Sequence, residues 1–253
     1  MIEHLDYNTV SSNYDERYSG SPLNGIAEAL NNLVAKHKPK NILEVGCGTG
    51  QWLTEIRNDS VKKFGADISL GMLRQCKKKA ASSQLICADA NNLPFFQPCF
   101  DLIYCVNAIH HFPKKKDFIF SSSEILNHNG VLSITGFDPH NQNDQWYIYN
   151  YFDGTYSKDL DRYPSFSDLE SWMNEAGFKN VRTEIADTVI NTWTGNDVFN
   201  DLFLRKHQSS QLAILSDSEY AAGINKMKLA VSRNEKIIFP VYLTFMMITG
   251  NMG

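Results

Sequence analysis

Three glycines at alternate positions mark the point where a predicted strand ends and a predicted helix begins. The run Glu44-Val45-Gly46-Cys47-Gly48-Thr49-Gly50 ends the apolar strand 41–45, and the helix starts at about residue 51. Glycines let the chain turn sharply and let a ligand lie against bare main chain, and a helix start adds unpaired amides. Asp67 ends the next predicted strand, where its carboxylate can accept both ribose hydroxyls of an adenosine. The pattern predicts a site for an adenosine-containing ligand.

The same two features are also found in nicotinamide-dependent oxidoreductases, so the glycine spacing has to separate the classes. The dinucleotide fingerprint G-x-G-x-x-G needs glycine at position 51, which is Gln51, and the third glycine comes one residue early at Gly50. A seat for pyrophosphate is therefore disfavoured. The G-x-x-x-x-G-K-[ST] loop of Walker-type nucleotide sites does not occur in the sequence.

Several stretches, in order, resemble class I (Rossmann-like) S-adenosylmethionine-dependent methyltransferases of the small-molecule type, closely over about residues 40–140. The glycine run resembles the family's first motif, and Asp67 resembles its ribose-binding acid. Residues 87–90 with 93–95 resemble the adenine-binding turn, residues 100–112 the fourth strand with the loop after it, and residues 126–132 the turn before strand five. The resemblance implies S-adenosyl-L-methionine as cofactor and S-adenosyl-L-homocysteine as product. The cofactor-binding residues that it implies, with two tyrosines of a covering N-terminal segment, are Glu44, Gly46, Cys47, Gly48, Gly50, Asp67, Ile68, Met72, Asp89, Ala90, Asn107, Tyr14 and Tyr18.

Methyl transfer from a sulfonium chiefly requires that an acceptor atom be aligned with the methyl group, an effect worth about 7–11 kcal/mol. A general base helps if the acceptor carries a proton. His110 and His111 follow the fourth predicted strand, and the resemblance favours His111 slightly as the catalytic residue. An alternative is that both histidines only shape the loop. Nothing in the spacing of the histidines and Asp138 is diagnostic of a metal site, so none is predicted.

Aromatic residues are concentrated between positions 146 and 163, which predicts a substrate wall with flat apolar surface and hydroxyl groups. The alternative is that these side chains pack the segment onto the core. The predicted substrate-binding residues are Asp138, His140, Trp146, Tyr147 and Tyr151.

Strands and helices alternate through the first half of the chain, which predicts an α/β fold with a parallel sheet. Helices are expected at 22–36, 51–58, 70–81 and 116–127, and strands at 41–45, 64–68, 85–88, 100–106 and 131–137. A helix that starts at a capping box of Ser167 and Glu170 should precede strand 181–189, and the last strand should cover 241–249. The resemblance implies a doubly wound, seven-stranded, mostly parallel sheet with an antiparallel last strand.

We interpret residues 1–253 as a single domain. Its expected parts are an N-terminal lid and helix (1–38), a cofactor-binding core (39–140), an aromatic substrate loop (141–164) and a helical cap insertion (190–235). The insertion should contain a helix that begins at a capping box of Ser216 and Glu219. It would either cover one edge of the active-site mouth or thicken the core.

The amino-acid composition limits the classes of partner that we expect this protein to bind. The 253 residues carry a net charge of −4 with both signs interspersed, so a nucleic-acid partner is not expected. Asn107 is followed by Ala108 and Ile109, which does not match the motif of nucleic-acid amino-methyltransferases. Five cysteines without a CxxC pair fit reduced thiols in the cytoplasm, and no segment has the length and apolarity of a leader or a membrane span. We expect a cytoplasmic monomer or homodimer that acts on a small-molecule methyl acceptor, or alternatively a cofactor-binding protein without catalysis or a nicotinamide-dependent oxidoreductase.

Overall fold

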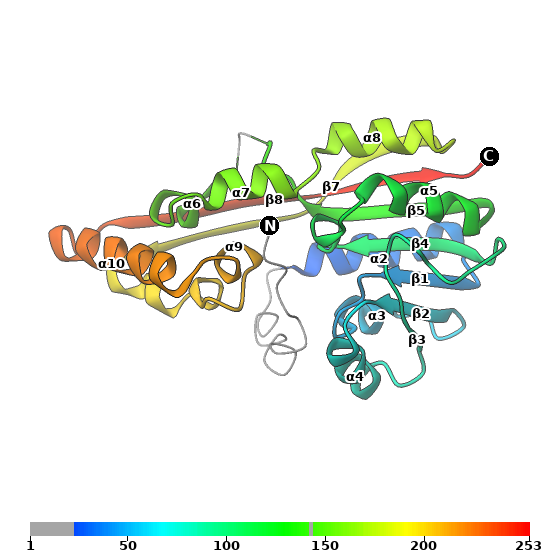
Figure 1. Ribbon diagram of the computed structural model, residues 1–253, viewed down its shortest axis with the longest axis horizontal. Helices are drawn as coiled ribbons and strands as arrows, with labels where there is room; N and C mark the ends of the chain where they lie inside the picture. Colours follow the sequence, from blue (N-terminus) through cyan, green and yellow to red (C-terminus); the bar gives the residue numbers. More distant parts are fainter. Residues whose placement is uncertain (1–22, 142–143) are drawn as a thin grey trace.

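A computed structural model describes residues 23–141 and 144–253. The first half alternates strands and helices (Figure 1). Its elements are α2 (Asn24–His37), β1 (Asn41–Val45), α3 (Gln51–Glu55), β2 (Lys62–Asp67), α4 (Leu70–Lys79), β3 (Gln84–Cys87), β4 (Phe100–Val106), η2 (Ile109–His111), α5 (Lys115–Ile125) and β5 (Leu126–Phe137). The second half contains β6 (Gln145–Trp146), α6 (Tyr147–Tyr151), α7 (Thr155–Arg162), α8 (Phe166–Glu175), β7 (Lys179–Thr194), η3 (Gly195–Asn200), η4 (Leu202–Leu204), α9 (Ser210–Ala213), α10 (Asp217–Arg233) and β8 (Ile238–Asn251).

The sheet has the order β3-β2-β1-β4-β5-β8-β6, and β7 pairs with β8. Strands β1 to β5 are parallel, whereas β8 is antiparallel to β5, β6 and β7. The mostly parallel α/β sheet with an antiparallel last strand is therefore confirmed. The expected count of seven strands is one short, because the two residues of β6 add an eighth strand by pairing with Val241 and Tyr242 of β8.

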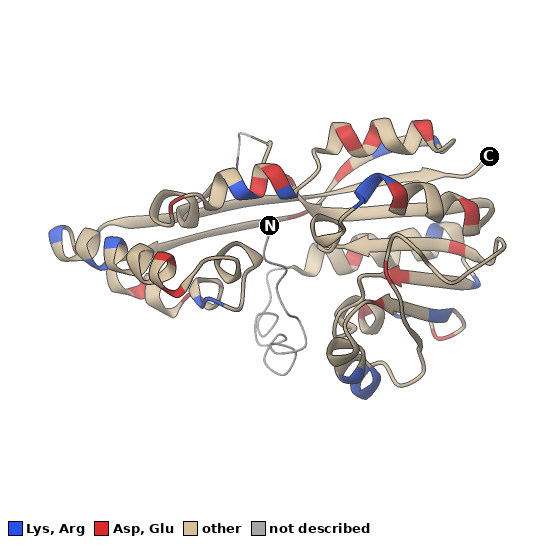
Figure 2. Cartoon of the chain, in the orientation of Figure 1, with Lys and Arg blue, Asp and Glu red and all other residues tan. Residues whose placement is uncertain are grey.

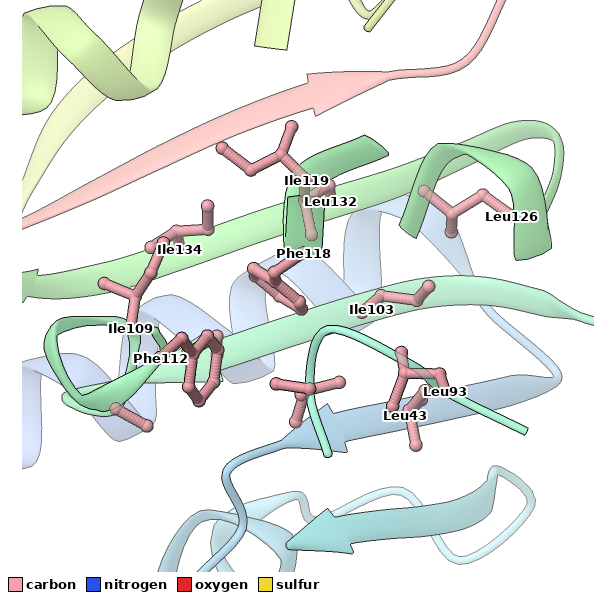
Figure 3. Packing of buried hydrophobic residues seen from close by; sticks show 14 of the residues in the cluster. Leu43, Leu93, Ile103, Ile109, Phe112, Phe118, Ile119, Leu126, Leu132 and Ile134 are labelled. Atoms are coloured by element: carbon pink, nitrogen blue, oxygen red, sulfur yellow. The ribbon is translucent and has the colours of Figure 1, made fainter. Parts of the chain in front are cut away.

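Helices cover both faces of the sheet, as expected for a doubly wound fold. On one face, Phe118 and Ile119 of α5 pack on Ile103, Leu132 and neighbouring strand residues (Figure 3). On the other face, apolar residues of α2, α3 and α4 pack against alternate residues of β1 and β4. Burial on both faces explains why successive residues of β4, from Leu102 to Val106, are apolar.

Beyond the parallel part of the sheet, β7 and β8 continue as a long two-stranded arm (Figure 1). A third apolar cluster covers the arm, where Tyr147 of α6, Leu212 of α9 and Met227 of α10 pack on Phe239 and Val241 of β8. The segment between β7 and β8 is helical, and its capping box of Ser216 and Glu219 is present as predicted.

Several boundaries differ from the predictions: β7 runs to Thr194 rather than ending at 189, β8 covers Ile238–Asn251 rather than 241–249, and α3 ends at Glu55 rather than at 58. Strand β5 begins at Leu126 rather than at Val131, because Leu126 pairs with Phe100 and the four residues that follow bulge out before Val131 pairs with Leu102. The capping box of α8 consists of Ser165 and Asp168, not of Ser167 and Glu170.

The segment 141–164 is also not the loop that we expected. Its described residues form β6, α6 and α7. Helix α6 is held against the core because Tyr147 and Ile148 are fully buried, and α7 ends in the buried pair of Asp159 and Arg162. Aromatic side chains of this segment therefore belong to helices that pack against the core.

Helix α10 carries acidic side chains in its first turn and basic ones toward its end, and α5 carries charges of both signs (Figure 2). In the part of the chain that the structure describes, no helix is both long enough and apolar enough to cross a membrane. All five cysteines are free thiols.

Candidate functional site

A pocket lies at the carboxyl ends of β1, β2 and β4. The chain winds from β1 toward β3 in one direction and from β4 toward β5 in the other, so the pocket lies at the point where the strand order reverses. Ligands of open α/β sheets bind at such points. The predicted residues that line the pocket are Gly46, Cys47, Gly48, Asp67, Ile68, Met72, Asp89, Ala90, Asn107 and His111.

The glycine loop after β1 turns through left-handed backbone conformations. Gly46, Gly48 and Gly50 have φ values of 74°, 51° and 83°, which strain any other residue. A Cβ atom at Gly46 would lie 2.5 Å from the Cβ of Ala108, and one at Gly50 would collide with the sulfur of Cys76. A Cβ atom at Gly48 would meet nothing within 4 Å. Gly48 therefore presents bare main chain to the open pocket, while the other two glycines allow close packing beneath it.

Asp67 connects the glycine loop to the end of β2. Its Oδ2 accepts a hydrogen bond from the amide of Gly48 at 2.8 Å, and its Oδ1 accepts one from the amide of Ser69 at 2.8 Å. Burial raises the pKa of the Asp67 carboxyl, and the two backbone amides oppose that rise. Carboxylate oxygens carry several lone pairs, so both atoms can still accept from a ligand.

The next part of the pocket follows β3. One carboxylate oxygen of Asp89 accepts hydrogen bonds from the backbone amide of Asn91 at 2.9 Å and from its side-chain amide at 2.8 Å. These bonds fix the turn that brings Asp89 and Ala90 to the pocket wall. Ile68, 72% exposed, lies on the same side of the pocket, so flat apolar surface is available beside the carboxylate.

The turn η2 holds the two histidines after β4. Ile109 and Phe112 flank them in sequence and are both buried in the core (Figure 3). His111 lines the pocket, whereas His110 is buried beside it. The centroids of the two imidazole rings are 3.9 Å apart, and His110 stacks on Tyr163 at 4.0 Å. The structure thus brings one of the two predicted catalytic residues to the pocket and places the other directly behind it.

Glu44 and Gly50 do not line the pocket. The Glu44 side chain is fully buried, and the hydroxyl of Tyr104 donates a hydrogen bond to its Oε2 at 3.4 Å. Burial raises the pKa of Glu44 well above its ordinary range. Glu44 therefore supports the glycine loop from within the core.

The predicted substrate residues do not gather at the pocket. Asp138 accepts hydrogen bonds from the backbone amides of His140 and Phe166, which fixes the connection from β5 to α8. His140 contacts the carbonyl oxygen of Tyr163 through Nε2 at 3.1 Å. In residues 23–141 and 144–253, no group of three or more His, Cys, Asp or Glu side chains could hold a metal ion.

Trp146, Tyr147 and Tyr151 belong to the third apolar cluster instead. Tyr147 is fully buried, and its hydroxyl donates to Asp201 at 2.7 Å. These contacts match the alternative in which the aromatic residues pack the segment onto the core. Tyr14 and Tyr18 lie outside the described residues.

Some lining residues were not predicted. Thr49, Gln51 and Trp52 continue the glycine motif into α3, and Ala108, Phe112 and Pro113 flank the histidines, so proximity to a motif could have identified them. The others are strand ends that only the register reveals: Val45, Ala66, Ala88 and Val106.

Comparison with known proteins identifies the region that builds this pocket. A family model described as "Methyltransferase domain" matches residues 42–130. Residues 42–130 are thus similar to a methyltransferase domain. The methyltransferase domain includes the glycine loop, Asp67, Asp89 and both histidines.

Curated relatives share this domain rather than the whole chain. Malonyl-[acyl-carrier protein] O-methyltransferase of Legionella pneumophila is 31% identical over 110 residues, which cover 41% of this chain and 38% of that protein. The chain therefore matches well under half the length of that relative.

Solved structures extend the likeness to the fold of nearly the whole chain. A methyltransferase from an antibiotic biosynthesis pathway of Anabaena variabilis has a TM-score of 0.69 at 18% identity and covers 90% of this chain and 97% of its own. Phosphoethanolamine N-methyltransferase 2 of Haemonchus contortus, solved with S-adenosyl-L-methionine, has a TM-score of 0.62 at 16% identity, covering 97% of this chain and 57% of its own. These likenesses show that the chain shares the fold of these proteins.

Proposed function

We propose that this protein transfers a methyl group from S-adenosyl-L-methionine to a small-molecule acceptor. The observation that carries the proposal is the combination of bare main chain at Gly48 with the Asp67 carboxylate in one pocket at the strand-order reversal. The methyltransferase domain supports the same reaction, since its residues 42–130 supply both features.

The pocket fits the cofactor on chemical grounds. Asp67 and Asp89 offer carboxylate oxygens for ribose hydroxyls and for the exocyclic amine of adenine, and Ile68 offers apolar surface for the adenine ring. The open space over Gly48 leaves room for the methionine part, where any Cβ would intrude. Gln51 stands where a dinucleotide fingerprint would need glycine, which disfavours a pyrophosphate seat and agrees with a ligand that carries no phosphate.

The cofactor, when bound, supplies an electrophilic methyl group on a sulfonium. The protein's task is then to hold an acceptor atom in line with that methyl and to exclude water, which is worth about 7–11 kcal/mol. His111 is the lining residue that can take a proton from the acceptor, an effect of about 10²–10⁴-fold where the acceptor is acidic. Phe112 and Pro113 beside it present apolar surface toward the acceptor.

An acceptor other than a nucleic acid is supported by the names of the relatives and by the net charge of the chain. The curated relatives include the malonyl-[acyl-carrier protein] O-methyltransferase and a phthiotriol/phenolphthiotriol dimycocerosates methyltransferase of Mycobacterium tuberculosis, which is 30% identical over 112 residues. Both names describe acceptors outside nucleic acids. The net charge of −4 also disfavours a polyanionic acceptor.

The test is an incubation of the protein with methyl-labelled S-adenosyl-L-methionine and a fractionated small-metabolite extract. Label should move into a small-molecule fraction with wild-type protein, and at least about tenfold more slowly with His111→Gln, because a base contributes at least that much. A His128→Gln variant is the matched control, since His128 lies at the opposite end of the sheet against Gly253. Label that stays in the cofactor across all fractions would contradict the proposal.

A further inference from the structure

Two cationic side chains lie close to the turn η2 that carries the histidines. The first is Lys115, a half-buried residue that begins α5. Its Nζ atom donates a hydrogen bond to the carbonyl oxygen of Phe112 at 3.3 Å. Phe112 lines the pocket next to His111, so the Lys115 ammonium contacts the wall against which we place the methyl acceptor.

The second cation is Arg162, the last residue of α7. The central carbon of its guanidinium lies 5.5 Å from the centroid of the Tyr163 ring, and Tyr163 stacks on His110 at 4.0 Å. The ring of His110 in turn lies 3.9 Å from that of His111. The fold therefore brings a cation from α7 and a cation from α5 to the same pair of histidines, although the two helices are distant in sequence.

The negative charge near these two cations does not balance them. Asp159, which is fully buried, pairs with Arg162. Within residues 23–141 and 144–253, no carboxylate forms an ion pair with Lys115. Burial lowers the pKa of Lys115, and the nearby charge of Arg162 lowers that pKa further. Two cations that repel each other with one carboxylate for the pair leave an excess positive charge, which a bound anion neutralises.

We propose that Lys115 and Arg162 form an anion site, which binds a carboxylate or phosphate group of the methyl acceptor. The site holds this group beside the histidines while the reacting atom lies at His111, which gives the alignment that methyl transfer requires. Both residues determine specificity, because an uncharged acceptor leaves the excess charge without a partner. The inference rests on the proposed methyl transfer and narrows its acceptor to an anionic small molecule.

A single anionic group differs from the polyanionic acceptors that the net charge of −4 disfavours. Long-range attraction of a polyanion depends on the charge of a whole surface, whereas one carboxylate or phosphate needs only a local excess of positive charge. The anion site is therefore compatible with the acidic balance of the chain.

The acceptor class is tested with a small-metabolite extract that an anion-exchange resin has separated into retained and unretained fractions. Each fraction is incubated with wild-type protein and methyl-labelled S-adenosyl-L-methionine. Label should enter a compound from the retained fraction. The mass of the labelled product then distinguishes a carboxylate acceptor from a phosphate acceptor.

The role of Lys115 is tested with the retained fraction at subsaturating acceptor. Lys115→Met removes the charge and keeps the aliphatic stem, so the rate should fall at least about tenfold, as expected when a hydrogen bond to a charged group is lost. Lys115→Arg keeps the charge and should keep most of the rate. Lys114→Met is the matched control and should stay within about twofold of wild type, because the Lys114 side chain is 72% exposed and pairs with Asp117.

The outcomes separate this inference from the proposed function. Binding of S-adenosyl-L-homocysteine, measured by calorimetry, should stay within about twofold of wild type in Lys115→Met, since Lys115 does not line the pocket. Label that enters only compounds of the unretained fraction, or equal rates in Lys115→Met and Lys114→Met, would overturn the anion site and leave the methyl transfer intact. Label in neither fraction would overturn the methyl transfer, and the anion site with it.

Discussion

Asp67 both stabilises the glycine loop and lines the pocket. Its carboxylate accepts hydrogen bonds from two backbone amides and also faces the space for a ligand. Replacing it with alanine removes the proposed partner of the ribose and the anchor of Gly48. Hydrogen bonds to charged groups are worth about 1.5–3 kcal/mol, so the affinity for S-adenosyl-L-homocysteine should fall by at least about tenfold in Asp67→Ala. Calorimetry measures this loss, with Asp153→Ala as the control because Asp153 pairs with Lys226 at the surface. Equal affinity in both variants would refute the placement of the ribose.

Gly48 and Gly154 provide a matched pair of glycines. Both have positive φ values, 51° and 75°, and a Cβ atom at either would meet nothing within 4 Å. Alanine at either position should cost about 1–2 kcal/mol of unfolding free energy from backbone strain. Only Gly48→Ala places its methyl group in the pocket, so only that variant should also lose affinity for S-adenosyl-L-homocysteine. Equal affinity in the two variants would show that Gly48 does not face the ligand.

At the scale of elements, capping patterns located helix starts correctly where no second pattern competed. Ser216 and Glu219 form the capping box of α10 as predicted. Before α8 the sequence offers Ser165 with Asp168 and Ser167 with Glu170. The first pair forms the box, because the amide of Phe166 then donates to Asp138 while Leu169 and Met173 are buried. Tertiary contacts therefore decide which of the two pairs forms the capping box, and the local sequence does not distinguish between them.

The capping box of α10 also has a measurable energy. The Ser216 hydroxyl accepts from the amide of Glu219 at 3.2 Å, and the Glu219 carboxylate accepts from the amide of Ser216 at 2.7 Å. Ser216→Ala should lower the unfolding free energy by about 1 kcal/mol in urea titrations. Ser232→Ala, which removes a hydroxyl that donates to the carbonyl of Leu229 in the same helix, should change it by less than half as much. The reverse order of the two effects would contradict the role assigned to the cap.

Across the whole molecule, features set by residues close together in the sequence could be predicted from it, whereas contacts between segments distant in the sequence could not. The glycine loop and Asp67 were identified because glycine spacing and strand ends are local features. Tyr147 gave no local sign that it would bond Asp201 in a core rather than face a ligand. The contacts of Tyr163 with His110 and Gln211 join segments about 50 residues apart, and only the packing of the insertion on the arm brings them together.

Burial of Glu44 beneath the glycine loop makes the stability of the whole fold depend on pH. Burial raises the pKa of this carboxyl above its ordinary value of 4.5, so the folded state binds the proton more tightly than the unfolded state. That contribution to stability is complete below pH 4.5 and is lost as the pH rises toward the folded pKa. The unfolding free energy of wild type should therefore fall relative to that of Glu44→Gln between pH 4.5 and 8, measured by urea titration. A difference that stays constant would contradict a protonated, buried Glu44.

The most direct test of the central claim is a crystal structure of the protein with S-adenosyl-L-homocysteine. We expect the ribose hydroxyls to lie within hydrogen-bonding distance of the Asp67 carboxylate, with the homocysteine part over Gly48 and the sulfur on the side of His111. Density for the nucleoside at any other place, or a pocket closed by side chains at saturating ligand, would contradict it.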